Sequence, residues 1–292
     1  MSTTSTGPSP ILQSFVLERV GETSFHAPSV PDERRPVVFG GQIMGQMIRA
    51  ASTYDPTKSV RSLNAIFARA GTVKLPVEIE LDPVHSGRAL GSVTATVSQG
   101  ERLLSRGLLL LDVGEPDVIR HQIPVMPTGG PDETPPVDAP DHPGVEVRLV
   151  DSVDLMTTAA TGPAEVHVWV RFLDLPADAD TALHQAALSW YTDPFLIAAA
   201  MRPHEGIGQQ QAHATLSTGV ISHTLTFHDP FRADEWLLIA NRSLHAGSGR
   251  TYGEGQVFTE AGHLVASFVQ TNMIRYFRDD APGATGKAAG VM

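Results

Sequence analysis

The chain has 292 residues, 41% of them hydrophobic, which is enough for one large domain or two small ones. A formal net charge of −11 argues against nucleic-acid binding, and the absence of cysteine excludes disulfides, thiolate metal sites and cysteine nucleophiles and fits a cytoplasmic protein. No stretch approaches about 18 consecutive apolar residues, and the polar first residues lack the features of a signal peptide, so we expect no membrane insertion.

The first strong pattern is helical and begins at a pair of glycines, Gly40 and Gly41. Apolar residues recur from there at the spacing of one helix face, at Ile43, Met44, Met47, Ile48 and Ala51. Gln42 and Gln46 fall off this face, and Gly45 interrupts the helix at a cost of up to about 1 kcal/mol relative to alanine. An interior glycine of this kind indicates that another backbone passes close by.

Strand patterns follow the helix. Alternation of apolar and polar residues predicts strands at 77–81 and 93–97, and a tight turn at Gly100 leads into a mostly apolar strand at 103–113. Residues 114–146 are crowded with Pro, Gly and Asp and show no period, so we expect an extended linker there.

The same succession of patterns then returns. A helix is predicted over 178–191, limited by Pro194. Strand patterns cover 166–172, 220–227, 236–244, 252–258 and 264–276. The segments "VSQGERLLSR" and "FTEAGHLVAS" read as one strand–turn–strand unit used twice. We therefore predict an α+β protein made by tandem duplication. Its expected parts are an N-terminal half at 11–113, the linker at 114–146, a C-terminal half at 147–277 and a tail at 278–292.

Several stretches, taken in order, resemble the acyl-CoA thioesterase II (TesB-like) family. They are "VFGGQIMGQMIRAA", "SLNAIFARAG", "DPFLIAAAMRPHEGIG", "ISHTLTFHDPFRADEWLL" and "GQVFTEAGHLVASFVQTNMIR". The resemblance implies a double hotdog fold, two long helices on a curved and mostly antiparallel sheet. It also implies hydrolysis of acyl-CoA to free acid and CoA, with acyl-CoA as partner and neither cofactor nor metal.

The family typically positions a water with an Asp, a Thr and a Gln from the second half. The Gln matches Gln270, but the Asp position holds Ser222 and the Thr position holds Leu244. The resemblance therefore implies an altered catalytic site that lacks the usual carboxylate. Gln270 shares the inward parity of its strand, which fits either a water-holding amide or a core amide with its own partners.

Other side chains could contribute to this site. Ser222 can hold a water but cannot act as a base by itself, and His223 should point to the opposite face of the strand. His245 follows Leu244 at an expected strand end, where it is either a base or simply exposed. Asn64 occupies the polar slot of a first-half strand, as a donor to the carbonyl or as a structural amide.

The residues around the start of the first helix are the predicted substrate-binding group: Phe39, Gly40, Gly41 and Gln42. Amides in a first helical turn can face a carbonyl oxygen, although the glycines could equally serve a tight turn. Asp193 and Asp229 are the nearest carboxylates in the matched stretches, and both are expected to be turn residues.

Other chemistries find little support. The sequence has no phosphate-loop or dinucleotide fingerprint, and its twelve histidines show no paired metal spacing. Two alternatives to a working thioesterase stay open: a binding protein for acyl-CoA with weak or no turnover, and a hotdog hydratase, which would need a positioned His with a carboxylate. A duplicated half leaves sheet edges and helix faces to cover, so we expect a homodimer or a larger homo-oligomer.

Overall fold

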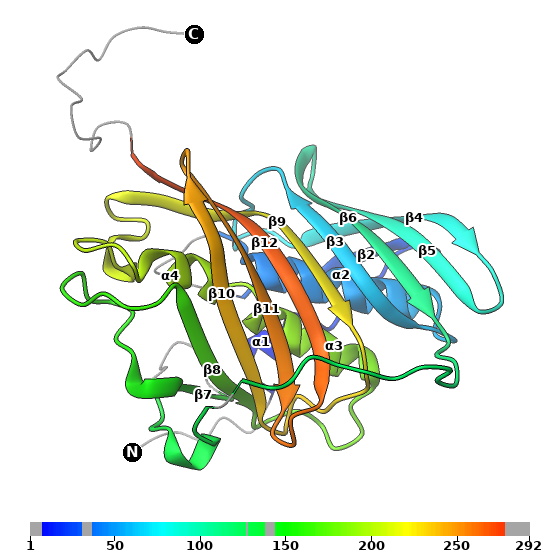
Figure 1. Ribbon diagram of the computed structural model, residues 1–292. Coiled ribbons are helices and arrows are strands. Elements are labelled where there is room, and N and C mark those ends of the chain that lie inside the picture. Colours follow the sequence, from blue (N-terminus) through cyan, green and yellow to red (C-terminus); the bar gives the residue numbers. More distant parts are fainter. Residues whose placement is uncertain (1–7, 31–36, 127, 138–143, 278–292) are drawn as a thin grey trace, which may run out of the picture.

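A single antiparallel sheet of twelve strands runs through the computed structural model, which describes residues 8–30, 37–126, 128–137 and 144–277 (Figure 1). The strands lie in the order β1-β2-β4-β5-β6-β3-β9-β12-β11-β10-β8-β7. Two helices, α2 and α3, lie together on one side of the sheet, behind the strands in the view of Figure 1. We call this side the inner face and the opposite side the outer face.

The two halves of the sheet have the same topology. In the first half the elements are β2 (Ser24–Ala27), α2 (Gly40–Tyr54), β3 (Ser59–Phe67), β4 (Val77–Ser86), β5 (Leu90–Gln99) and β6 (Arg102–Asp112). In the second half they are β8 (Glu165–Phe172), α3 (Thr181–Tyr191), α4 (Phe195–Met201), β9 (Leu216–Phe227), β10 (Leu237–Gly247), β11 (Arg250–Thr259) and β12 (Leu264–Tyr276). Each half runs from its first strand at the outside to its second strand at the centre, which confirms the predicted duplication.

The halves join where β3 and β9 pair at the middle of the sheet, with Leu63 opposite Leu225. Short strands extend both outer ends: β1 (Glu18–Arg19) pairs with β2, and β7 (Val145–Leu149) pairs with β8. β7 begins inside the segment predicted as linker. The predicted tail at 278–292 lies outside the described residues, as do residues 127 and 138–143 of the linker.

The two central helices run antiparallel and very close together. A Cβ on Gly41 would lie 2.8 Å from the Cα of Trp190, and a Cβ on Gly45 would lie 3.0 Å from the backbone oxygen of Ala186. One turn further along, Arg49 pairs with Asp180 at 2.5 Å. The interior glycine therefore serves a close helix crossing, as its position in the sequence predicted.

Burial on the inner face follows the predicted periods. The alternating residues of β4, β5 and β8 point inward, and the apolar face of α2 is fully buried against them. Gln42 and Gln46 are buried as well, at 1% and 0% exposure, although the helical pattern places them off the apolar face. The reason is α1 (Pro10–Gln13) and the segment after β2, which cover that side of α2 and receive hydrogen bonds from both amides.

The region between α3 and β9 holds a second helix that the sequence did not predict. α3 ends at Tyr191, and α4 begins directly after Pro194, so Pro194 separates two helices and does not end the helical region. Among the described residues, no helix combines the length and the apolar character needed to cross a bilayer.

The segment after β6 crosses the outer face of β12 and β11 before it reaches β7 (Figure 1). Gln122 fixes this path, because its side chain donates to the backbone oxygen of Gly262 at 2.8 Å and accepts from the backbone nitrogen of Leu264 at 3.0 Å. Further on, Trp169 of β8 donates to the backbone oxygen of Gly129 at 3.0 Å. The segment therefore covers apolar side chains that the outer face would otherwise expose.

Candidate functional site

The start of α2 has no capping side chain on its N-cap residue. Phe39 is its N-cap and makes no capping hydrogen bond with its side chain; its ring packs on Trp190 at 4.8 Å between centroids. The first amides of an α-helix have no partner within the helix and form the positive end of its dipole. This end of α2 therefore favours a carboxylate or a carbonyl oxygen placed against it.

Gln270 lies on the inner face of β12 and is 1% exposed. Its Nε2 donates to the backbone oxygens of Thr192 and Asp193, both at 3.1 Å, where α3 turns into α4. These bonds fix the orientation of the amide, and its two hydrogens serve three neighbouring atoms, so at least one of them is shared. The same Nε2 lies 2.9 Å from Nδ1 of His223.

His223 lies directly opposite Gln270 in the pairing of β9 with β12 and is completely buried. Because Gln270 presents an N–H-bearing atom to Nδ1, the ring is best accommodated with Nδ1 as acceptor and its hydrogen on Nε2. The Nε2–H group is then a donor. The ring also packs against Phe268, with 5.4 Å between centroids.

Asp193 brings a carboxylate to the same place from the turn between α3 and α4. It is 4% exposed, and its Oδ1 lies 3.8 Å from Nδ1 of His223. A Cβ on Gly40 would lie only 2.8 Å from this Oδ1, so the carboxylate stands against the first residue of α2. We call Gln270, His223, Asp193 and Gly40 the Gln270 cluster.

The Gln270 cluster contains several polar atoms that need a partner. Oε1 of Gln270, Nε2 of His223 and Oδ1 of Asp193 are all buried and find no hydrogen-bond partner among the residues that the structure describes. A buried polar atom without a partner costs about 1–3 kcal/mol, so three of them in one cluster are unusual in a folded protein. One donor and two acceptors are thus available to a polar ligand.

The predicted meeting of Ser222 with Gln270 is not what the structure shows. Ser222 pairs with Thr271 and with Ile66, and these positions belong to the outer face. The pleat separates Ser222 from the inward-facing His223, so the two neighbours point to opposite sides. Asn64 also lies on the outer face and donates to Oγ1 of Thr224 at 2.9 Å.

Leu244 and His245 lie far along β10, where the strand projects beyond the body of the sheet. Leu244 is 48% exposed, and His245 is exposed next to a bulge in the pairing of β10 with β11. Neither residue belongs to the Gln270 cluster. The structure thus gathers Gln270 and the helix start but not the other predicted catalytic residues.

Of the predicted substrate-binding residues, Gly40 belongs to the Gln270 cluster, whereas Gly41 and Gln42 make contacts that serve the fold. Gly40 faces Asp193, whereas Gly41 faces the backbone of α3 and serves helix packing. Gln42 uses its amide within the fold, since Oε1 accepts from Val30 and Nε2 donates to Pro28, both at 3.2 Å. The two glycines therefore have different roles, one in close packing and one in admitting a carboxylate.

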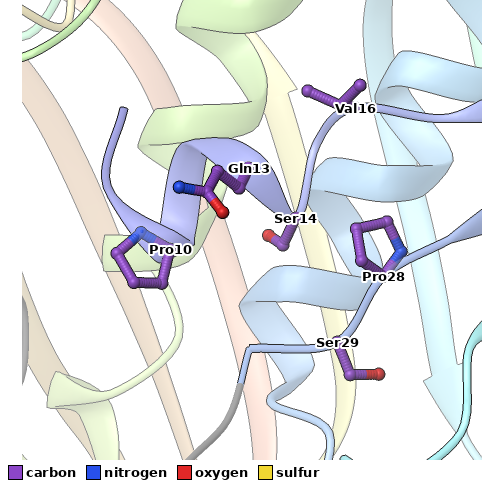
Figure 2. A pocket seen from close by; sticks show the side chains of 6 residues that line it. All are labelled: Pro10, Gln13, Ser14, Val16, Pro28 and Ser29. Atoms are coloured by element: carbon purple, nitrogen blue, oxygen red, sulfur yellow. The ribbon is translucent and has the colours of Figure 1, made fainter. Parts of the chain in front are cut away.

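A cavity of about 390 Å³ lies beside α1, and Figure 2 shows Gln13 and Ser14 on the side of α1 and Pro28 and Ser29 on the segment after β2. A second, of about 550 Å³, lies between the linker and β8 and is lined in part by His167. Neither is lined by a residue of the Gln270 cluster. Buried polar atoms without a partner can bind and orient a reacting ligand, whereas the size of a cavity does not by itself indicate a reaction. We therefore place the candidate site at the Gln270 cluster.

Sequence reasoning passed over His223 and Asp193. His223 has the same parity as Leu225 and Phe227, which are both buried, so the strand pattern already indicated an inward side chain. Asp193 does lie in a turn, as expected, but nothing in the local sequence says that this turn packs against the start of α2. That contact depends on the close antiparallel crossing of α2 and α3.

Comparisons with known proteins agree with this architecture. The family model described as the acyl-CoA thioesterase N-terminal domain matches residues 30–111, and the one described as the C-terminal domain matches residues 127–274. Mouse acyl-coenzyme A thioesterase 8 is 26% identical over 275 residues, which cover 84% of this chain and 82% of the mouse protein.

Solved structures give the same result. An acyl-CoA thioesterase II, TesB2, from Mycobacterium marinum is 26% identical with a TM-score of 0.76, over 91% of this chain and 98% of the other. A hotdog-fold protein from Alicyclobacillus acidocaldarius, 21% identical, aligns with a TM-score of 0.72 over 91% of this chain and 97% of its own, which confirms the fold. The chain therefore belongs to the acyl-CoA thioesterase II (TesB-like) family, and it is a thioesterase with a double hotdog fold.

Proposed function

We propose that the chain hydrolyses acyl-CoA thioesters to free carboxylic acids and CoA by direct attack of water at the Gln270 cluster. The observation that carries this proposal is the set of three buried, unpaired polar atoms beside the start of α2. Thioester hydrolysis needs a held water, a proton acceptor and donors for the oxyanion. One donor and two acceptors in a closed site match that requirement.

In this arrangement Oε1 of Gln270 accepts a hydrogen from the water and orients it. Nε2–H of His223 and the first amides of α2 donate to the thioester oxygen, where negative charge develops during the attack. Ser222 takes no part, because it lies on the outer face. The proposal involves no covalent intermediate, and the cluster contains no serine or cysteine nucleophile.

A thiol-release assay over acyl-CoA substrates of different chain lengths tests the proposal. Wild type should release CoA, and Gln270→Ala should reduce kcat by at least 100-fold, roughly the effect of losing one oriented group of such a site. Ser222→Ala and Asn64→Ala are matched controls from the outer face and should stay within about twofold of wild type. Wild type that releases no thiol from any acyl-CoA would contradict the function, and an unchanged Gln270→Ala would contradict the site.

A second candidate is an acyl-CoA binding protein with weak or no turnover, which the missing carboxylate at position 222 favours. Tight binding of a CoA ester, with hydrolysis no faster than in buffer, would select it. His223 and Asp193, which lie 3.8 Å apart without a hydrogen bond, are also the two types of residue that a hydratase needs. Loss of enoyl-CoA absorbance without thiol release would identify that activity.

We further propose that the chain forms a homodimer or a larger homo-oligomer. The outer face of the central strands supports this, because Ile66, Leu108 and Leu110 are 57%, 51% and 38% exposed there. Light scattering gives the mass directly, and a monomer at micromolar concentration would contradict the proposal. A cytoplasmic location is also proposed, with support only from the cysteine-free composition.

A further inference from the structure

Direct attack of water needs a group that takes the water's proton, and position 222 offers only a serine on the wrong face of the sheet. We propose that Asp193 is this proton acceptor, and that Gly40 is a glycine because its missing side chain makes room for the Asp193 carboxylate. The inference rests on the proposed hydrolysis of acyl-CoA at the Gln270 cluster. It assigns the catalytic carboxylate to the turn after α3 and not to β9.

Burial singles out Asp193. Of the 32 acidic residues in the chain, it is the one that is fully buried among those the structure describes. Its Oδ1 has no hydrogen-bond partner among the described residues, and Nδ1 of His223 lies 3.8 Å from it. A buried carboxylate without a close partner weakens a fold, so a purely structural role gives no reason to keep it.

The backbone that carries the Asp193 carboxylate is well fixed. Nε2 of Gln270 binds the backbone oxygen of Asp193 at 3.1 Å, so the amide that holds the water also holds the residue that would take its proton. Oγ1 of Thr192 donates to the backbone oxygen of Ser189 at 3.0 Å, and Pro194 restricts the backbone on the other side. Gly40, the first residue of α2, lies next to the carboxylate, and the N-terminal end of a helix dipole favours an anion.

His223 is better suited to a different task. Its Nδ1 faces the amide of Gln270 at 2.9 Å, so this nitrogen is not available to accept a proton from water. Its unpaired Nε2–H is a donor and suits the thioester oxygen. The cluster therefore divides the work: Gln270 orients the water, Asp193 takes the proton, and His223 stabilises the oxyanion.

The reaction balances with these groups alone. The water oxygen forms a bond to the thioester carbon while one water proton moves to Oδ1 of Asp193, and the carbonyl oxygen becomes the oxyanion. When the tetrahedral intermediate collapses, the C–S bond breaks, and the leaving CoA sulfur takes the proton back from Asp193. The products are the free carboxylic acid and the CoA thiol, and the carboxylate is regenerated.

Asp193→Asn tests the inference, because it keeps the size of the side chain and removes only the acceptor. We expect kcat to fall at least 100-fold, KM and the affinity for a non-hydrolysable thioether analogue of acyl-CoA to stay within about threefold, and the melting temperature to stay equal or rise. A purely structural role would instead lower the melting temperature and spare kcat. Asp229→Asn, on an exposed ion pair with Arg120, is the control and should match wild type.

Gly40→Ala gives an independent measurement, since its Cβ would displace the carboxylate by direct contact and should reduce kcat at least tenfold in folded protein. Gly40→Ala also tests the role of Asp193 if Asp193→Asn does not fold. If Gln270→Ala loses activity while folded Asp193→Asn or Gly40→Ala keeps it, the role of Asp193 is wrong and the proposed function stands. If wild type itself releases no thiol from acyl-CoA, the proposed function has failed first.

Discussion

His223 and Gln270 stand directly opposite each other on β9 and β12, with 2.9 Å between Nδ1 of the ring and Nε2 of the amide. Both side chains are completely or almost completely buried. Because the amide nitrogen of Gln270 carries hydrogens, the contact favours Nδ1 as the acceptor and leaves Nε2 as the donor. Two substitutions of His223 can separate these functions, because an asparagine imitates Nδ1 and a glutamine reaches as far as Nε2.

His223→Asn should keep the contact with Gln270 through its side-chain oxygen but lose the donor at the position of Nε2. We expect the melting temperature to change little and kcat to fall about 100- to 1000-fold, the usual effect of removing one oxyanion donor. His223→Gln, which can present an amide N–H near the position of Nε2, should retain more activity. Thiol release by the two purified variants measures this. Equal kcat for wild type and His223→Asn would mean that the ring does not contact the reacting oxygen.

Gly45→Ala should weaken the fold. Its Cβ would lie 2.3 Å from a ring carbon of Phe15 and 3.0 Å from the backbone oxygen of Ala186. Overpacking of this kind costs about 1–3 kcal/mol, which exceeds the gain of up to about 1 kcal/mol in helix propensity. Urea unfolding measures the difference.

Gly219→Ala is the matched control for this experiment, because nothing lies within 4 Å of the Cβ it would add on β9. We expect its free energy of unfolding to stay within about 0.5 kcal/mol of wild type. If Gly45→Ala proves equally neutral, the helix crossing is looser than the contacts of Gly45 indicate.

Much of the fold can be predicted from periodicity in the sequence. Alternation located β4, β5, β8 and β12, and the glycine-led helical pattern located α2, because in each case one face is buried and the other is not. The same reasoning places Ser222 and His223 on opposite faces of β9. The error was to choose the face from an alignment position, when the buried neighbours of His223 indicated the inner one.

What the sequence could not show depends on contacts between distant segments. Gln46 looks like a surface residue on α2, but α1 and the segment after β2 cover it and accept its hydrogen bonds. Asp193 looks like an ordinary turn residue until the crossing of α2 and α3 brings Gly40 against it. Local patterns carry no information about either contact, and the candidate site is made of such contacts.

Stability should decrease at mildly acidic pH. Burial lowers the pKa of His184, as it does for His167 and His228, below the usual 6.5. The unfolded chain therefore binds protons near pH 6.5 that the folded chain still excludes. These histidines therefore leave the free energy of unfolding unchanged above pH 6.5. Below pH 6.5 they lower it, by up to about 1.4 kcal/mol per pH unit for each histidine.

Urea unfolding at pH 7.5, 6.5 and 5.5 measures this dependence. In His184→Asn the side-chain oxygen can replace Nδ1, which now accepts from the backbone nitrogen of Ala233 at 3.0 Å. This variant should show a smaller decrease than wild type over the same range. A hydrogen bond from Arg232 lowers the pKa of Asp234 below 3.8. The contribution of Asp234 to stability is therefore lost only at more acidic pH and does not affect this comparison. A wild-type protein equally stable at all three pH values would contradict the prediction.

Arg148 should fasten the linker to the outer face of the second half. Its guanidinium lies 4.8 Å from the ring centroid of Trp236, pairs with Glu146 at 2.5 Å and donates to the backbone oxygens of Pro131 and Thr134. A lysine cannot reproduce this planar set of donors, so Arg148→Lys should increase proteolytic cleavage within 128–137 and cost about 1–2 kcal/mol of stability.

The kcat of Arg148→Lys should equal that of wild type, because the linker lies on the outer face and the Gln270 cluster on the inner one. Arg242→Lys is the matched control, since Arg242 forms an exposed ion pair with Glu254, and such pairs contribute little to stability. Limited proteolysis of the two variants beside wild type compares them directly. If both are cleaved at the same rate as wild type, Arg148 is not what holds the linker in place. If Arg148→Lys loses activity without added cleavage, the two faces of the sheet are coupled in a way that the contacts of Arg148 do not explain.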